Sequence, residues 1–237
     1  MSNFFRFNVA DQVFEALPES CFGIIAIRGA GNTEAIPAIS DFLNEQIALQ
    51  EEKLAGVNVK ELPAIACYRQ AFIQLGVNPN KFMCSIEALL SRIAKKKGFP
   101  SINPLVDLAN AISIKYALPI GAHDLSTIEG ELSVRFAEPG DTFVAFGSTE
   151  VETPEEKELL YVAGHDIRTR RWIWRQSEVG KITADTTDVF FPIDGFTNIN
   201  KEQVLAARDE LSLLLARYFD LQPVLGFVDR TNPEFCF

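Results

Sequence analysis

Three polar residues share one side of a predicted helix that is otherwise mostly apolar. Asn103, Asp107 and Asn110 are spaced four and three residues apart, and no lysine or arginine occurs between Asn103 and Lys115. Because residues at these spacings lie on the same helix face, a carboxylate and two amides must find partners in a mostly buried place. A buried polar group without a partner costs about 1–3 kcal/mol. The stripe therefore either ties the fold together or points at a ligand.

The position of each residue in this stripe indicates its role. Asn103 precedes Pro104, which is the arrangement of a helix cap followed by proline at the first helical position. Asp107 is expected to support the structure by accepting hydrogen bonds from backbone or arginine donors. Asn110 lies deeper in the helix and has no capping role, so it could face either the protein interior or a ligand pocket.

His123 and Asp124 are adjacent and could be read as an acid–base pair. Successive residues of an extended segment point to opposite faces, so these two side chains would not orient each other. We expect Asp124, which precedes Leu-Ser-Thr, to form an Asx-turn. His123 is then a lone imidazole that is either structural or part of a pocket. Because the chain has only two histidines, we do not expect a multi-histidine metal site, which leaves a magnesium ion held by carboxylates alone as the open alternative. We expect no metal and no cofactor.

Arg135 and two threonines are further candidates for a ligand pocket. Arg135 occurs among apolar residues, where an arginine pairs either with a carboxylate of the protein, such as Asp107 or Asp124, or with a carboxylate of a ligand. Thr186 and Thr187 stand at the start of a predicted strand. Their hydroxyl groups either satisfy the strand end or contact an acyl or ribose oxygen.

Arginine and tryptophan alternate in one short segment, which we call the Arg/Trp cluster. Its members are Arg168, Arg170, Arg171, Trp172, Trp174 and Arg175. The net charge of the chain is −10, which argues against DNA binding and against broad, tight binding of RNA. The cluster could nevertheless contact RNA locally, and its tryptophans would either pack in the core or stack on bases.

The elements that must position these residues change in kind along the chain. Helices are predicted at 37–54, 63–75, 85–97, from 103 onward, and from 200 near the C-terminus. Strands are predicted at 22–28, 131–136, 142–146, 159–163, 171–176 and 187–191. The sequence therefore predicts an α+β fold in which a helix-rich first half packs on a strand-rich, mainly antiparallel second half.

The composition is that of a globular chain of 237 residues, of which 47% are hydrophobic. No signal-like segment or run of about 20 apolar residues is found, so we expect a cytoplasmic protein with no membrane partner. The four cysteines stand far apart and are expected to be buried, reduced thiols. No linker or internal repeat divides the chain, and a single domain over 1–237 is expected.

Several short patterns follow one another in a fixed order. They are Tyr68-Arg69, Gly76-Val77-Asn78-Pro79, Ser85-Ile-Glu87-Ala-Leu-Leu, Ile102-Asn103-Pro104-Leu-Val-Asp107-Leu-Ala-Asn110 and Leu118-Pro119-Ile-Gly121-Ala-His-Asp124. With Val134-Arg135 and Thr186-Thr187, this series resembles the B3/B4 domain, the tRNA-binding and editing domain of the phenylalanyl-tRNA synthetase β subunit. The resemblance covers about 63–195, between an N-terminal strand–helix lead-in at 1–62 and a C-terminal helix and tail at 196–237.

The resemblance implies a B3/B4-like domain as a free-standing protein, without aminoacylation machinery. In that family the domain hydrolyses phenylalanine tRNA that has been wrongly charged with tyrosine. We therefore expect a hydrolase that edits mischarged aminoacyl-tRNA in trans, with tRNA or aminoacyl-tRNA as its partner. The alternative is a non-catalytic module that binds tRNA, an amino acid or a related small metabolite.

When the family's pocket residues are matched to this sequence one by one, the resemblance places the pocket asparagine on Asn110. The sequence departs from the family at two other positions. Gly121 stands where the family has a histidine, and His123 occupies the family's phenylalanine position on the same face. The family's tyrosine-recognising glutamate falls near Pro192, with Asp194 as the nearest acid. These departures weaken the expectation of tyrosine specificity. They leave ester hydrolysis open, because the terminal hydroxyl of the tRNA can assist.

Overall fold

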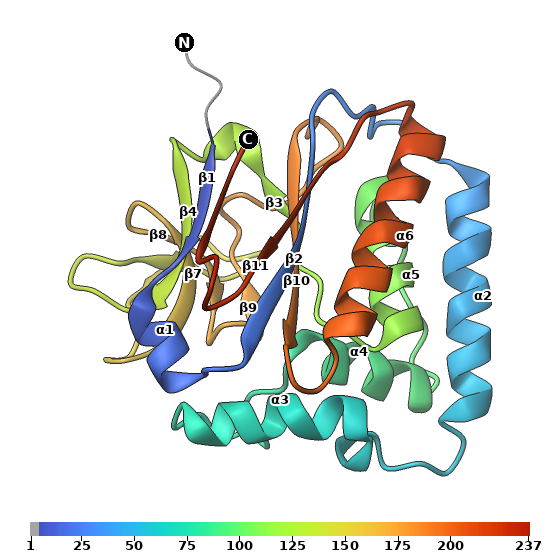
Figure 1. Cartoon of the computed structure of the whole chain (residues 1–237). Helices are drawn as coiled ribbons and strands as arrows, with labels where there is room; N and C mark the ends of the chain where they lie inside the picture. The colour runs from blue at the N-terminus through green and yellow to red at the C-terminus, as the bar shows by residue number, and fades with distance from the viewer. Residues whose placement is uncertain (1–4) are drawn as a thin grey trace.

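Two β-sheets lie face to face, and helices cover the outer face of one of them (Figure 1). The computed structural model describes residues 5–237. The six-stranded sheet has the order β12 (Glu234–Cys236), β1 (Arg6–Val9), β4 (Glu131–Phe136), β7 (Leu159–Ala163), β8 (Asp166–Arg170) and β9 (Arg175–Gln176). The four-stranded sheet has the order β11 (Val224–Val228), β2 (Ser20–Ile27), β10 (Val189–Phe196) and β3 (His123–Asp124). The fold is α+β with mainly antiparallel sheets, as predicted.

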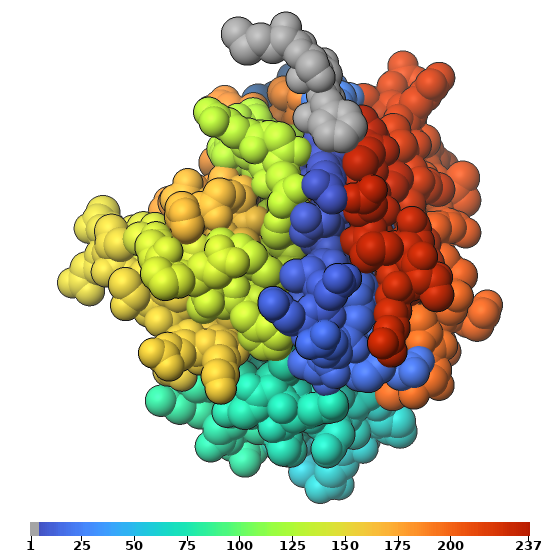
Figure 2. Space-filling view, turned by 60° about the vertical axis from the view of Figure 1, so that its left-hand side comes forward, coloured from blue at the N-terminus to red at the C-terminus, as the bar shows by residue number. Residues whose placement is uncertain are grey.

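Strand β1, near the N-terminus, lies between the C-terminal strand β12 and the strand β4 in the six-stranded sheet. It pairs in parallel with β4 and antiparallel with β12, and Figure 2 shows it in blue between β4 in lime and the C-terminal segment in dark red. A short helix, α1 (Asp11–Ala16), follows it, and a small separate hairpin is formed by β5 (Phe143–Val144) and β6 (Val151–Glu152). The other ladders are antiparallel.

Aromatic rings fill the space between the two sheets. The ring of Phe7 on β1 lies 5.8 Å from that of Phe22 on β2 and 5.0 Å from that of Phe190 on β10. Every residue of β2 and β10 is buried, because one face of this sheet meets the other sheet and the second face meets helices. The chain has 19 phenylalanines against four tyrosines and two tryptophans. Most of the described phenylalanines lie in the hydrophobic core or pack against it.

Helix α6 (Lys201–Phe219) packs on the four-stranded sheet through two glycines. A Cβ on Gly23 of β2 would lie 2.9 Å from Cγ1 of Val204, and a Cβ on Gly195 of β10 would collide with Cγ2 of the same valine. The helix can therefore approach the sheet more closely than any other residue at these positions would allow. Helix α5 (Pro104–Tyr116) is mostly buried beside α6, and α2 (Pro37–Lys53) covers it from outside (Figure 1). Helices α3 (Pro63–Gln74) and α4 (Ser85–Ala94) close one end (Figure 1).

The helices expected at 37–54 and 63–75 agree with α2 and α3, and the strands expected at 131–136 and 159–163 agree with β4 and β7. The strand expected at 171–176 is wrong, because residues 171–174 form the turn between β8 and β9.

Among residues 5–237, no helix has both the length and the apolar character needed to cross a membrane. Cys21 and Cys84 are buried and free, whereas Cys236 is exposed because it lies on the edge strand β12.

Candidate functional site

A cavity of about 80 Å³ opens beside β10, where the segment that leads into β3 runs along that strand. Its volume exceeds the roughly 10–15 Å³ that one water molecule needs. The lining side chains combine aromatic rings with several polar groups. The lining residues are Ser85, Pro119, Ile120, Gly121, His123, Tyr161, Thr169, Trp172, Ile173, Trp174, Gln176, Pro192 and Asp194. We call this space the Asp194 cavity.

One wall of the Asp194 cavity is fixed by backbone hydrogen bonds between β10 and the segment before β3. The amide of Gly121 donates to the carbonyl of Pro192 at 2.9 Å, and the amide of Asp194 donates to the carbonyl of Pro119 at 3.1 Å. His123 then pairs with Phe190 in the β3–β10 ladder. The wall is therefore an extension of the sheet rather than a loose loop, and it holds its side chains in defined positions.

Asp194 is the most unusual group in the site. Its side chain is almost completely buried, with 1% of the residue exposed. Oδ1 accepts a hydrogen bond from the hydroxyl of Tyr161 at 2.7 Å and another from Nε1 of Trp172 at 2.6 Å. Burial raises the pKa of Asp194 to about 7, although these two hydrogen bonds act in the opposite direction. Near neutral pH the carboxyl group therefore exchanges its proton readily.

The backbone around Trp172 adopts an unfavourable conformation beside this carboxyl group. Arg171 and Trp172 have φ angles of 46° and 61°, a left-handed region that residues other than glycine, asparagine and aspartate seldom occupy. The turn directs the indole of Trp172 into the interior, where it packs near Tyr68 and Phe72 and donates to Asp194. Strain of this kind persists where surrounding contacts fix it, often at functional sites.

His123 lies on the edge strand β3, which pairs with β10, and it lines the same cavity as Asp194. Its ring stacks on that of Tyr161 with centroids 5.4 Å apart, and 1% of the residue is exposed. Burial, with a smaller effect of the Arg168 charge, lowers the pKa of His123 to about 3. The imidazole is therefore neutral at physiological pH. Its Nδ1 is buried without a hydrogen-bond partner among the described residues.

Gly121 and Pro192 are the two positions where the sequence departs from the B3/B4 pattern. They lie next to each other on one wall of this cavity. A Cβ on Gly121 would lie 3.0 Å from Cγ of Pro192 and 3.2 Å from Nε2 of His123. Gly121 therefore lets Pro192 and the imidazole pack closely at this wall, where any side chain at position 121 would be crowded. Gly121 and His123 line the same cavity, which agrees with their expected position on one face.

A chain of hydrogen bonds holds the backbone of Asp194 in place. The hydroxyl of Tyr68 donates to the backbone carbonyl of Asp194 at 2.8 Å, and Nδ2 of Asn200 donates to that hydroxyl at 3.0 Å. Asn200 in turn accepts from the amide of Phe196 at 2.7 Å. This chain fixes the end of β10 against α3 and the start of α6.

The polar stripe on α5 has a structural role at its first two positions. Asn103 caps α5 by accepting from the amide of Val106 at 3.1 Å, and Asp107 accepts from the amide of Ile102 at 2.8 Å and from the hydroxyl of Ser101. Both residues line a separate cavity of about 200 Å³. Asn110 is half-buried and does not line the Asp194 cavity, so the structure does not bring it together with Gly121 and His123.

The side chains of Asp124, Thr186 and Arg135 are held by partners within the protein. Asp124 forms the expected Asx-turn with Ser126 at 2.9 Å and accepts from the hydroxyl of Thr186 at 2.7 Å. Thr187 is exposed at the entry to β10. Arg135 makes two hydrogen bonds with the carboxylate of Asp141, at 2.7 and 2.8 Å, rather than with Asp107 or Asp124. None of these groups lines the Asp194 cavity.

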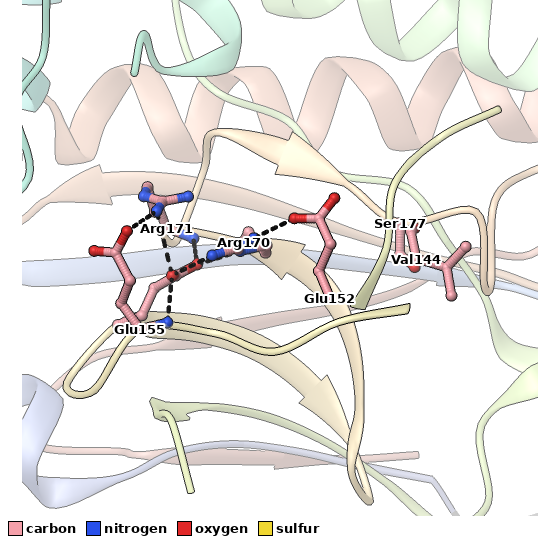
Figure 3. A network of polar contacts seen from close by, with 7 residues as sticks. Val144, Glu152, Glu155, Arg170, Arg171 and Ser177 are labelled. Atoms are coloured by element: carbon pink, nitrogen blue, oxygen red, sulfur yellow. Dashed lines mark hydrogen bonds and ion pairs between the residues drawn. The ribbon is translucent and has the colours of Figure 1, made fainter. Parts of the chain in front are cut away.

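The Arg/Trp cluster divides into buried ion pairs and cavity walls. Arg170 binds Glu158 through Nε at 2.8 Å and Glu152 at 2.7 Å, and Arg171 binds Glu155 at 2.8 Å (Figure 3). Burial would raise the pKa of Glu158, but the hydrogen bond and charge of Arg170, together with the charge of Arg171, lower it overall.

The other arginines of the cluster differ in exposure. Arg168 is buried and donates to the hydroxyl and carbonyl of Thr127 at 2.8 and 2.6 Å. Arg175 is the exposed arginine of the cluster and lies over the ring of Trp174. The three buried guanidinium groups of the cluster do not present a surface to phosphates, and those of Arg170 and Arg171 are in addition paired with glutamates. Trp172 and Trp174 line the Asp194 cavity instead.

Asp194 and Tyr161 are the cavity groups that sequence reasoning did not select. Asp194 is the single acid in the apolar run of β10, and a lone carboxylate in a buried strand is itself a signal of a partnered or functional group. Tyr161 gave no such signal, because it reads as an ordinary strand residue. In the described part of the chain, no three histidine, cysteine or acidic residues are grouped to hold a metal ion.

Comparison with known sequences gives matches to a domain family and to phenylalanine–tRNA ligase β subunits. A family model described as the B3/4 domain matches residues 67–231, past the C-terminal limit expected from the motifs. The phenylalanine–tRNA ligase β subunit of Vibrio parahaemolyticus is 33% identical over 96 residues, which cover 40% of this chain and 12% of that protein. The same subunit of Colwellia psychrerythraea is 29% identical over 136 residues, covering 56% of this chain and 16% of that protein. The matches thus span a small part of these relatives.

A solved structure shares the fold. It is an N-terminal fragment of the phenylalanyl-tRNA synthetase β subunit from Pyrococcus horikoshii, with a TM-score of 0.51 and 13% sequence identity. The alignment covers 92% of this chain and 49% of that fragment. At this identity the match supports the arrangement of helices and strands, and the chemistry of the cavity must be argued from this chain's own residues.

Proposed function

The chain belongs to the B3/4 domain family, and on this premise we propose that the Asp194 cavity receives the aminoacyl end of a charged tRNA and hydrolyses its ester bond. In that reaction water adds to the ester carbonyl carbon, and the bond from that carbon to the ribose oxygen breaks. The ribose oxygen takes a proton and the amino acid leaves as a carboxylate.

The observation that carries the proposal is the combination of polar groups inside one partly enclosed space. Asp194 lines the cavity with a carboxyl group whose pKa is about 7, which suits a group that takes or gives a proton near neutral pH. Gln176 donates to the carbonyl of Ala122 at 2.6 Å, which leaves its own carbonyl oxygen available. Apolar rings on the other walls exclude bulk water and strengthen polar contacts within.

His123 contributes orientation rather than strong basicity. Its pKa of about 3 makes it a poor base at neutral pH, but a neutral imidazole still offers one donor and one acceptor. His123 lines the cavity, and Nε2 is not among the buried atoms that lack a partner, so this nitrogen can meet a bound water or acyl oxygen. Positioning of this kind supplies a large part of catalysis when the reacting groups are held close together.

The RNA would need a basic surface outside the buried Arg/Trp cluster. Lys95, Lys96 and Lys97 form an exposed run directly after α4, whose first residue, Ser85, lines the cavity. The ten residues of α4 span roughly 15 Å, which is within reach of a few nucleotides before the esterified end. We propose this lysine run and Arg175 as phosphate contacts.

Deacylation of a panel of aminoacyl-tRNAs tests the proposal. Release of amino acid from at least one of them is expected, and Thr169→Phe should abolish it because the new ring would fill the cavity that Thr169 lines. Asn110→Ala is the matched control and should leave the rate within about twofold, since Asn110 lies outside the cavity. If every charged tRNA survives an equimolar amount of the protein, hydrolysis is not the function.

Reversal of the lysine run tests the RNA surface separately. Changing Lys95, Lys96 and Lys97 to glutamate should weaken tRNA binding and reduce the slope of log affinity against log salt by about 0.7 for each lost phosphate contact. Lys53→Glu, at the far end of α2, is the control. An unchanged salt slope would remove the lysine run from the interface.

A second candidate function is binding without turnover. It is favoured by the neutral state of His123, the one imidazole among the cavity's lining residues. This alternative predicts thermal stabilisation by a small amino-acid-like ligand or by tRNA, by about 2.7 kcal/mol when the ligand is at 100 times its Kd, with no release of product. Absence of any stabilisation across amino acids and tRNA would exclude it.

A further inference from the structure

We propose that Asp194 recognises a free ammonium group on the bound acyl moiety, so that the site accepts aminoacyl esters and discriminates against α-hydroxyacyl and N-acylated ones. This inference rests on the proposed function and names its substrate class. It comes from the distribution of hydrogen bonds around the carboxyl group, from the rings beside it and from the volume of the cavity.

The two oxygens of Asp194 have different surroundings. Both protein donors, the Tyr161 hydroxyl and the Trp172 indole, bind Oδ1. No hydrogen bond to Oδ2 is made by the described residues, and Oδ2 is not among the buried polar atoms that lack a partner. Since Asp194 lines the cavity, Oδ2 is the oxygen that a ligand can reach. It can accept hydrogen bonds and carries negative charge when the carboxyl group is ionised.

The rest of the cavity favours a cation at this place. The rings of Tyr161, Trp172 and Trp174 line the same space, and aromatic faces attract ammonium groups. A carboxylate adds the counter-charge that such a buried cation needs, because an unpaired charge is strongly disfavoured away from water. The charge of Arg168 lowers the pKa of His123, whereas the pKa of Asp194 is set by burial and by its hydrogen bonds with Tyr161 and Trp172.

The volume limits what can accompany the ammonium group. At about 80 Å³, the cavity is about half the size of the ~150 Å³ engineered cavity that holds benzene. A phenyl or phenol ring therefore does not fit beside the ammonium group without rearrangement. Small aminoacyl groups, of the size of alanine, are the expected ligands.

The arrangement around Oδ1 makes Asp194→Asn an informative substitution. Tyr161 and Trp172 are both donors, so they require the oxygen of the asparagine amide at the Oδ1 position. The NH2 group must then take the place of Oδ2 and present donors to the cavity. An ammonium group can only donate, whereas a hydroxyl group can also accept. The substitution therefore converts an ammonium-binding position into one that suits a hydroxyl group.

The test compares tRNA charged with alanine and the same tRNA charged with lactic acid, which differ only in the amino or hydroxyl group. For the natural protein, kcat/KM is expected to be about 10- to 100-fold higher for the alanyl ester, the range of one charged hydrogen bond. Asp194→Asn should reduce or reverse this ratio. If the variant cleaves neither ester, its preference in Kd for the alanyl over the lactyl ester gives the same comparison and should fall likewise. Because both esters are measured with the same preparation, a partly unfolded variant does not change the ratio. N-acetylalanyl-tRNA should behave as a poor substrate of the natural protein.

The outcomes separate this inference from the proposed function. If the natural protein hydrolyses both esters equally, or if Asp194→Asn leaves the preference for the alanyl ester unchanged, ammonium recognition by Asp194 is wrong while hydrolysis stands. If neither these esters nor any other charged tRNA is hydrolysed, the proposed function itself fails.

Discussion

The buried carboxyl group of Asp194 should make the stability of the protein fall as pH rises from about 4 to about 7. The ordinary pKa of this group is 3.8, and burial raises it to about 7. In this interval the unfolded chain has released the proton while the folded protein still holds it, so folding becomes less favourable with increasing pH. Since each pKa unit corresponds to about 1.4 kcal/mol, the full effect is about 4 kcal/mol, present as stability below the unfolded pKa and lost above the folded one.

Asp194→Asn isolates this effect, because asparagine has nearly the same shape and does not titrate. Its amide oxygen can accept from Tyr161 and Trp172 as the carboxyl group does. Urea unfolding of both proteins between about pH 4.5 and about pH 7.5 should show the difference in unfolding free energy shifting by about 3 kcal/mol in favour of the variant. Curves that stay parallel across this range would refute the buried, protonated carboxyl group.

Three further predictions concern stability and are tested by the same unfolding measurement. His123→Gln should make the protein about 3 kcal/mol more resistant to lowering the pH from about 7.5 to about 4.5, since the folded state keeps the imidazole neutral down to about pH 3 while the unfolded chain protonates it near 6.5; equal acid sensitivity would contradict this. Glu158→Gln should destabilise by about 3–5 kcal/mol because it leaves buried arginines without their carboxylate, and a loss below about 1 kcal/mol would mean the pairs are solvated. Gly195→Ala should destabilise by about 1–3 kcal/mol through overpacking against α6, whereas Gly31→Ala, where a Cβ meets nothing within 4 Å, should change stability by less than about 0.5 kcal/mol.

Local signals in the sequence were sufficient for most helices and for two of the longer strands. Asn103 with Pro104 marks the start of α5, and Asn103 does cap that helix. Alternation and turn residues bounded β4 correctly. Strands that form only because they pair with segments far away in the sequence could not be predicted from local signals. Strand β1 is short and is defined by partners more than 100 residues away, on β4 and β12.

The turn after β8 shows why propensity alone failed. Arg171, Trp172 and their neighbours have the composition of a strand, yet two of them adopt positive φ angles. Tertiary contacts outweigh the local preference, because Arg171 pairs with Glu155 and the indole of Trp172 reaches Asp194. These contacts join segments that are far apart in sequence, so periodicity could not reveal them.

Two of the pocket candidates selected from the sequence line the Asp194 cavity. Gly121 and His123 were placed correctly on one face by the pleat of an extended segment, and both line the cavity. Asn110 was selected because it lacked a capping role, but the helix turns it away from that cavity. Charge pattern alone could not distinguish the buried arginines of the Arg/Trp cluster from exposed ones, because their acidic partners come from a different stretch, 152–158.

The most direct test of the account is a structure of the protein bound to 3′-deoxy-3′-(alanylamino)adenosine, which replaces the ester with an amide that resists hydrolysis. The account predicts that the alanyl group occupies the cavity with its ammonium nitrogen within hydrogen-bonding distance of Oδ2 of Asp194, while Tyr161 and Trp172 remain on Oδ1. An analogue bound at another surface, such as the cavity beside Asn103 and Asp107, or bound with its amine pointing to solvent, would contradict it.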